Sequence, residues 1–215
     1  MLAALMLVYR SEKKAGVVAL LKRSYDLNRI KAKRWYVPIL LTMPAVAVVT
    51  FGVQRLTGVQ VPIPHIAVVR TLVFCVVAYI AALGEELGWS GYAIDPLQAR
   101  WGALNASLML GAFWAVYHYV PLVQAHRSAI WIAWWTLYTV AARVIMVWIF
   151  NNTGRSVSGV SLFHMTLNVV WQSYPVSGSL LDYRIVGLTF AVMAVLVVLG
   201  WGPSMRGWRF RNSQT

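Results

Sequence analysis

Five side chains that can exchange protons or donate hydrogen bonds lie in or beside strongly apolar stretches of this sequence. They are two carboxylates, two imidazoles and an amide: Glu85, Glu86, His118, His164 and Asn168. Ionisable groups are costly in an apolar environment, so each is a candidate functional residue. A carboxylate beside an imidazole can take a proton from water, and a histidine with an asparagine can donate hydrogen bonds to an oxyanion. The set predicts hydrolysis of an amide bond by activated water, without a covalent intermediate.

The spacing of these residues places them on particular helix faces. His164 and Asn168 are four positions apart and therefore share one face of a helix, as do Trp114 and His118. The two glutamates are adjacent, so their side chains diverge by about 100° around a helix with 3.6 residues per turn. We expect only one of the two carboxylates to point squarely at a shared site.

The elements that position these groups are predicted to be membrane-spanning helices. The chain is 60% hydrophobic with a mean hydropathy of +0.64, against roughly 45–50% apolar residues in soluble domains. Lipid offers no partner for backbone N–H and C=O groups, so spanning segments must be helical. Six apolar stretches are long enough to cross the bilayer, at about residues 36–53, 66–83, 104–123, 130–150, 157–174 and 184–202. A seventh, Met1 to Tyr9, is too short to span.

This pattern predicts an all-α, polytopic transmembrane helix bundle with about six spans plus a truncated N-terminal helix. We divide it into a partial apolar helix with a basic cytoplasmic segment (residues 1–35), the helical bundle (36–202) and a basic cytoplasmic tail (203–215). No internal repeat of fixed period is found along the sequence.

The net charge of +13 is distributed as in a membrane protein. Nine of the nineteen Lys and Arg lie between Arg10 and Arg34, directly before an apolar stretch, and only Tyr25 is an aromatic residue among them. Base-stacking aromatics would be needed for nucleic acid, which we exclude as a partner. Across the loops, fourteen cations lie on one side and three on the other. The positive-inside rule therefore predicts that both termini are cytoplasmic, in agreement with an even number of spans.

The second apolar stretch is predicted to continue as a helix to about Ile94, because Pro96 is the first firm stop. The segment from Asp95 to Gly102 would then form the cytoplasmic turn. Counted from the cytoplasmic helix ends at 1.5 Å per residue, the candidate residues lie at depths of about 10–21 Å, with His118 the deepest. They are therefore expected to converge near the middle of the membrane.

Three motifs carry these residues in the order E-E-L-G-W-S, W-A-V-Y-H and H-M-T-L-N. In this the sequence resembles the CPBP intramembrane proteases, a family that includes the type II CAAX prenyl endopeptidases and the bacterial Abi-type proteins. The resemblance covers roughly residues 80–170. It implies an intramembrane endopeptidase (a hydrolase) that cuts a membrane protein, lipopeptide or prenyl-peptide-like substrate near the membrane surface. The location that it favours for this protein is the bacterial plasma membrane.

The resemblance also implies roles for the matching positions. Glu85 would be the general base assisted by His118, with Glu86 in support, and His164 with Asn168 would form the oxyanion site.

The sequence departs from the family pattern at two positions. Trp114 replaces a common Phe, and Ser90 stands where the family has an Arg four residues after the second Glu. Without that Arg, Glu86 would be a buried carboxylate that needs another partner. Arg143 is the cation whose expected depth in the membrane is closest to that of Glu86. We expect it either to pair with Glu86 as a supporting charge or to extend toward the lipid headgroups.

Three alternatives remain open from the residues. Two His and two Glu could bind zinc, but H-E-x-x-H is absent and Asn is a poor zinc ligand. The favoured mechanism therefore uses no cofactor, with zinc as the alternative. Because of Ser90, the chain could instead be a catalytically impaired pseudoenzyme that acts as a membrane partner or immunity-type protein. It could also belong to a proton-coupled transporter with the glutamates as a relay, although no inverted repeat supports this.

Overall fold

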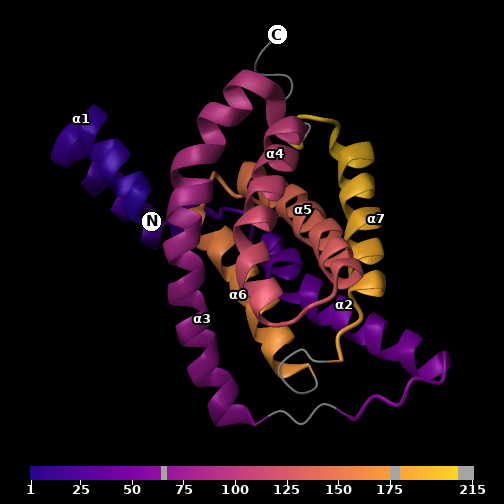
Figure 1. The fold of residues 1–215 in the computed structure, drawn as a ribbon. Coiled ribbons are helices and arrows are strands. Elements are labelled where there is room, and N and C mark those ends of the chain that lie inside the picture. Colours follow the sequence, from indigo (N-terminus) through magenta and orange to yellow (C-terminus); the bar gives the residue numbers. More distant parts are fainter. Residues whose placement is uncertain (64–66, 175–179, 208–215) are drawn as a thin grey trace. The chain divides into compact units, whose positions relative to one another are not determined.

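The chain folds into helices in a computed structural model that describes residues 1–63, 67–174 and 180–207 (Figure 1). No strand occurs among these described residues, so the predicted all-α class is confirmed. The α-helices in this part of the chain are α1 Leu2–Lys22, α2 Tyr36–Leu56, α3 Val68–Gly88, α4 Ile94–Gln124, α5 Ala129–Asn152, α6 Val157–Ser173 and α7 Tyr183–Trp201. Three 3-10 turns (Arg23–Tyr25, Leu27–Arg29 and Lys33–Trp35) join α1 to α2, and a π-helix, Trp89–Ala93, joins α3 to α4.

The six predicted apolar stretches coincide with the helices from α2 to α7. Four continuous helical stretches in the described residues are long and apolar enough to cross a membrane: Lys33–Leu56, Val68–Gln124, Ala129–Asn152 and Tyr183–Trp201. The second has 57 residues and contains both α3 and α4. Helix α6 has 17 residues, slightly fewer than the roughly 20 that a full crossing takes. These lengths and compositions are those of an integral membrane protein.

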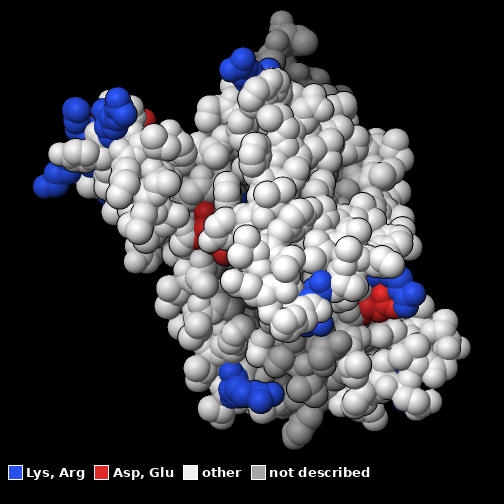
Figure 2. Space-filling model, viewed as in Figure 1, with Lys and Arg blue, Asp and Glu red and all other residues white. Residues whose placement is uncertain are grey.

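Apolar side chains on the outside of α3 support this assignment. Val69, Val73, Val77 and Ile80 recur at helical spacing, and each is more than half exposed. In Figure 2 the charged groups form a few separate patches, and most of the visible face is uncharged. Exposed apolar surface of this extent is stable in lipid but not in water.

Two predictions about local structure need correction. The helix does continue past Gly88, through the π-helix, but Pro96 does not end it, because a proline is tolerated in the first turn of an α-helix. The described helix is instead interrupted by a kink at Gly102, where φ is +76°. Helix α1 is also longer than predicted: it continues to Lys22 through a break at Lys13, where φ is +58°. The basic segment therefore starts inside a helix.

The chain divides into two compact units. The first unit contains residues 1–92 and 153–182, and the second contains residues 93–152 and 183–215. Of the predicted segments, Ile66 and residues 208–215, with Arg209 and Arg211 of the basic tail, lie outside the described residues.

In the first unit, α6 packs against both α3 and α2, and α1 packs against α3. The buried face of α6 carries Val157, Val160, Phe163 and Leu167, which recur every three or four residues. This apolar stripe fixes the rotation of α6 about its axis. His164 is next to Phe163 and is buried with it.

In the second unit, α5 packs against both α4 and α7. Its residues from Tyr138 to Asn151 are almost all buried, as expected for a helix with neighbours on both sides. Tyr138 meets Phe190 of α7 edge to face, with ring centroids 5.0 Å apart. Gly111 of α4 lies against the backbone of α5, where a Cβ would come within 2.9 Å of Val140 Cα. These contacts place the α4 and α5 residues of the candidate site.

Candidate active site

A carboxylate and an imidazole from two of the three motifs meet in the first unit. Oε1 of Glu86, near the end of α3, lies 3.1 Å from Nδ1 of His164 in α6. Glu86 is fully buried and His164 is 3% exposed. With Nδ1–H donated to the carboxylate, Nε2 of His164 faces away from Glu86. The glutamate thus fixes the orientation of the imidazole ring.

Ser90 supplies a second partner for the same carboxylate. Its hydroxyl donates a hydrogen bond to Oε2 of Glu86, and the side chain is 4% exposed. Ser90 lies in the π-helix Trp89–Ala93, a wide turn of a kind often found at functional sites. The position where the family has an Arg is therefore occupied by a smaller group that still bonds to Glu86. The sequence signal for this bond is a hydroxyl four residues after Glu86, which a comparison with the family Arg alone does not reveal.

The first turn of α6 is held by its own cap. Ser156 precedes the helix, and its Oγ accepts a hydrogen bond from the N–H of Gly159, 3.0 Å away. Asn168 follows His164 by one turn on this helix and is partly buried. The predicted His/Asn pair therefore lies on one helix in the order expected.

Glu85 and Glu86 differ in their surroundings. Glu86 is fully buried, whereas Glu85 is only partly buried. The two adjacent carboxylates therefore differ in burial, and the expectation that only one of them points at a shared site stays a prediction. The carboxylate that contacts His164 is Glu86, the residue predicted to play the supporting role.

His118 lies in the second unit, within an aromatic environment. Its Nδ1 is 2.8 Å from the carbonyl oxygen of Trp114, so Nδ1 donates and Nε2 carries the lone pair in the neutral ring. The rings of Trp114, Tyr117 and Trp135 lie 5.1–5.8 Å from the imidazole, measured between centroids. A histidine held in this way presents Nε2 as a proton acceptor.

Arg143 is also in the second unit and is fully buried. Its guanidinium carbon lies 4.5 Å from the centroid of the Trp114 ring, a cation–π contact. The alternative in which Arg143 extends to the headgroups is therefore wrong. Because Glu86 belongs to the other unit, the pairing of Arg143 with Glu86 stays a prediction.

The structure thus brings together Glu86, Ser90 and His164 in one unit, and Trp114, His118 and Arg143 in the other. The approach of His118 to the glutamates also stays a prediction from motif and depth.

No group of three or more His, Cys, Asp or Glu side chains that could hold a metal ion occurs in the described part of the chain. A catalytic zinc site needs three protein ligands and an open position. The residues described here do not form such a set.

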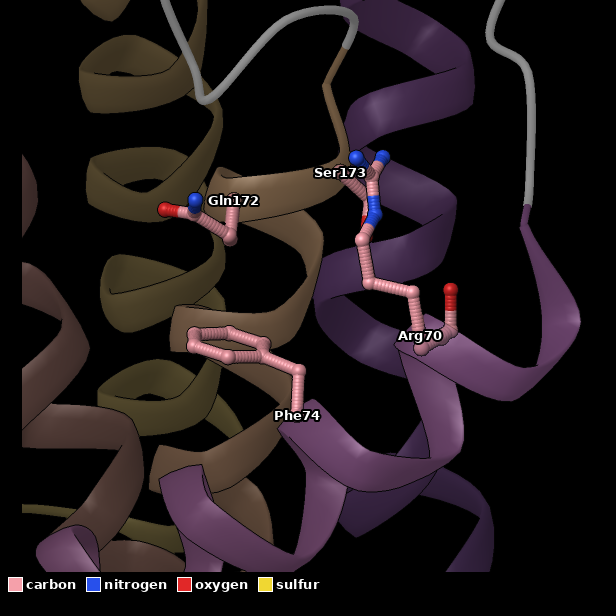
Figure 3. Close-up of a pocket in the computed structure, with 5 residues that line it drawn as sticks. Arg70, Phe74, Gln172 and Ser173 are labelled. Atoms are coloured by element: carbon pink, nitrogen blue, oxygen red, sulfur yellow. The ribbon is translucent and has the colours of Figure 1, made fainter.

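A cavity of about 160 Å³ lies at the other end of the α3 and α6 pair. Arg70 and Phe74 project from α3, and Gln172 and Ser173 belong to the end of α6 (Figure 3). Arg70 is sixteen residues before Glu86, or about 24 Å along a helix. This cavity is therefore distinct from the Glu86–His164 pair.

Comparison with known proteins identifies the region that carries the three motifs. Residues 66–170 match the family described as type II CAAX prenyl endopeptidase Rce1-like. A protein named CAAX prenyl protease 2, from Methanococcus maripaludis, is 29% identical over an alignment of 130 residues that covers 55% of this chain and 46% of that protein. The chain thus matches about half the length of this relative.

Both comparisons agree with the resemblance drawn from the motifs, which is confirmed. The matched region contains every candidate residue from Glu85 to Asn168. Residues 66–170, slightly less than half of this chain, are thus similar to the Rce1-like type II CAAX prenyl endopeptidases.

Proposed function

We propose that the chain is an intramembrane endopeptidase that hydrolyses a peptide bond near the membrane surface with water activated by Glu and His. The observation that carries this proposal is the buried hydrogen bond between Glu86 and His164, which joins the first and third motifs of the family. A purely structural histidine would not need a fully buried carboxylate as its partner, since burying both is costly.

In the proposed mechanism, Glu85 is the general base and His118 assists it. Glu85 takes a proton from water as the water oxygen attacks the peptide carbonyl. Nε2 of His118, which the bond to Trp114 leaves as an acceptor, positions the water or relays the proton. The proton then passes to the leaving amine as the C–N bond breaks.

His164 and Asn168 are proposed to stabilise the oxyanion that forms on the carbonyl oxygen. In its imidazolium form, His164 can donate from Nε2 while Nδ1–H stays on Glu86. The Asn168 amide, one turn along α6, can add a second donor. Glu86 holds the ring in place and balances its charge, while Ser90 holds Glu86.

The similarity to the family and the membrane helices support a proposal for the substrate class. The relative is named a CAAX prenyl protease, and we propose a lipid-modified peptide or membrane protein as the substrate of this chain. The lipid chain would remain in the bilayer while the peptide reaches the buried carboxylates.

A direct test uses the purified protein in detergent or nanodiscs with a library of quenched lipopeptides. We expect cleavage by the wild type and none by Glu85→Gln. Cleavage that chelator abolishes and only zinc restores would replace the proposed mechanism by a metal-dependent one. A folded wild type that cleaves no lipopeptide would favour the pseudoenzyme that binds membrane partners.

A further inference from the structure

The segment between α1 and α2 contains a buried acidic residue that binds the start of α6. Asp26 is 5% exposed. Its Oδ1 accepts hydrogen bonds from Ser156 Oγ (2.8 Å) and Ser158 N (3.0 Å), and its Oδ2 accepts one from Val157 N (3.1 Å). The carboxylate thus satisfies N–H groups that the first turn of a helix leaves without intrahelical partners.

The contact is reciprocal. The hydroxyl of Ser158 donates to the carbonyl oxygen of Ser24 at 2.8 Å and accepts from the N–H of Asp26 at 3.2 Å. Ser24 and Ser158 are both buried. The backbone of this short segment is therefore fixed to α6 from both directions.

Arg23 extends the connection to the end of α3. Its Nη1 donates to the carbonyl oxygen of Gly91 in the π-helix at 2.6 Å, and its Nη2 donates to the carbonyl oxygen of Arg155 at 3.0 Å. One guanidinium thus joins the turn that follows Glu86 to the loop that precedes α6. Its planar fork can satisfy both carbonyls at once.

These contacts lie close to the Glu86–His164 pair along both helices. Gly91 is five residues after Glu86, and Ser158 is six before His164. At 1.5 Å per residue these separations are about 8 Å and 9 Å. A shift of either helix at this end would therefore change the distance between the carboxylate and the imidazole.

We propose that Arg23 and Asp26 are positioning residues that hold the end of α3 in register with the start of α6, and so fix the hydrogen bond between Glu86 and His164. This inference rests on the proposed function for its effect on catalysis. Two residues of a segment that composition alone identifies only as basic and cytoplasmic would then serve the site. A misplacement of about 1 Å in an active site can reduce the rate about 10²-fold.

The test compares Asp26→Asn and Arg23→Gln with the wild type. The Asn amide would place an N–H₂ group against the N–H of Val157, and the Gln side chain is too short to join both carbonyls. Lys22→Gln is the matched control, because it removes a cation from the exposed neighbour of Arg23. Arg23→Lys keeps the charge and can retain one of the two bonds.

The first readout is nitrogen-15 NMR of histidine-labelled protein in detergent, with His164 assigned by its loss in His164→Gln. In the wild type and in Lys22→Gln we expect Nδ1 of His164 to carry the proton. In Asp26→Asn and Arg23→Gln we expect its ring signals to shift toward those of a free histidine, with Arg23→Lys between them. Helix content and gel-filtration profile identify the variants that fold. If Asp26→Asn does not fold, the comparison of Arg23→Gln with the wild type tests the proposal.

The second readout is lipopeptide cleavage, where we expect kcat to fall about 10- to 100-fold with KM changed little. Unchanged His164 signals in folded Arg23→Gln would overturn the inference, as would an unprotonated Nδ1 in the wild type. If the wild type cleaves nothing, the proposed function fails, while the NMR comparison still decides whether Arg23 and Asp26 position His164.

Discussion

At the scale of single residues, the candidate chemistry depends on how each polar group is held. Glu86 bonds to Ser90 and His164 inside one unit, and His118 is fixed by the Trp114 carbonyl in the other. In each histidine Nδ1 makes the hydrogen bond named here, so Nε2 points away from that partner. The two histidines thus have different hydrogen-bond partners. This agrees with the proposed roles, in which His118 accepts a proton and His164 donates a hydrogen bond to the oxyanion.

Removal of these groups should abolish cleavage while expression stays close to normal. For Glu85→Gln, His118→Ala and His164→Ala we expect losses of at least about 10² in rate, because a general base or an oxyanion donor contributes about that much. The measurement is kcat on the lipopeptide found in the library. His126→Asn is the control, since this histidine is exposed and its φ of +55° suits Asn. Wild-type turnover by any of the three would refute its assignment.

Ser90 offers a second prediction. Ser90→Ala removes a donor from the fully buried Glu86, and loss of one partner of a buried polar group costs about 1–3 kcal/mol. We expect a lower thermal midpoint and slower cleavage. Ser11→Ala, an exposed serine in α1, should change neither. Equal midpoints for the wild type and Ser90→Ala would show that this hydroxyl does not support the carboxylate.

Moving the positive charge from position 143 to position 90 tests whether Arg143 supports Glu86. Arg143→Ser should cripple cleavage, since it removes a buried cation that contacts Trp114. Adding Ser90→Arg should restore part of the activity if the lost charge had neutralised Glu86. A double variant no more active than Arg143→Ser would contradict the pairing and leave Arg143 with a packing role beside Trp114.

At the scale of elements, close approach of helices decides where the site residues lie. Helix α4 carries His118 and α5 carries Arg143, and the two helices meet at Gly111. A Cβ on Gly111 would lie 2.9 Å from Val140 Cα and 3.1 Å from Arg143 Cβ. The first of these atoms is backbone, so a side chain at this position forces the helices apart.

Gly111→Ala should therefore destabilise the protein, although alanine is the better helix former by about 1 kcal/mol. Overpacking of this kind costs about 1–3 kcal/mol, which outweighs the gain in propensity. We expect a lower thermal midpoint and reduced cleavage. Gly200→Ala in α7 is the matched control: a Cβ there meets no atom within 4 Å, and it should raise the midpoint slightly. Equal midpoints for the two variants would contradict the packing argument.

At the scale of the whole molecule, the distribution of cations predicts the orientation in the membrane. We propose that both termini face the cytoplasm, because fourteen Lys and Arg on one set of loops oppose three on the other. Reporter fusions after residue 30 and after residue 212 should read as cytoplasmic, and a fusion near Gly58 should read as external. An external C-terminus would show that the number of crossings is odd.

The sequence by itself determined the fold class and the helices, and it supplied the residues proposed for the site. Membrane helices are determined by local composition, because lipid requires each segment to satisfy its own backbone hydrogen bonds. The motifs around Glu85, His118 and His164 are likewise readable along the chain, since i and i+4 positions share a helix face.

Only the tertiary structure decided which groups meet. That His164 contacts Glu86, that Ser90 donates to the same carboxylate and that Asp26 binds the start of α6 depend on how α3, α6 and the segment between α1 and α2 pack. The basic segment shows the difference most clearly: its net charge predicts only a cytoplasmic location, while Arg23 and Asp26 bind backbone groups far away in the chain. Composition averages over a segment, but a hydrogen bond depends on the position of individual atoms in the folded protein.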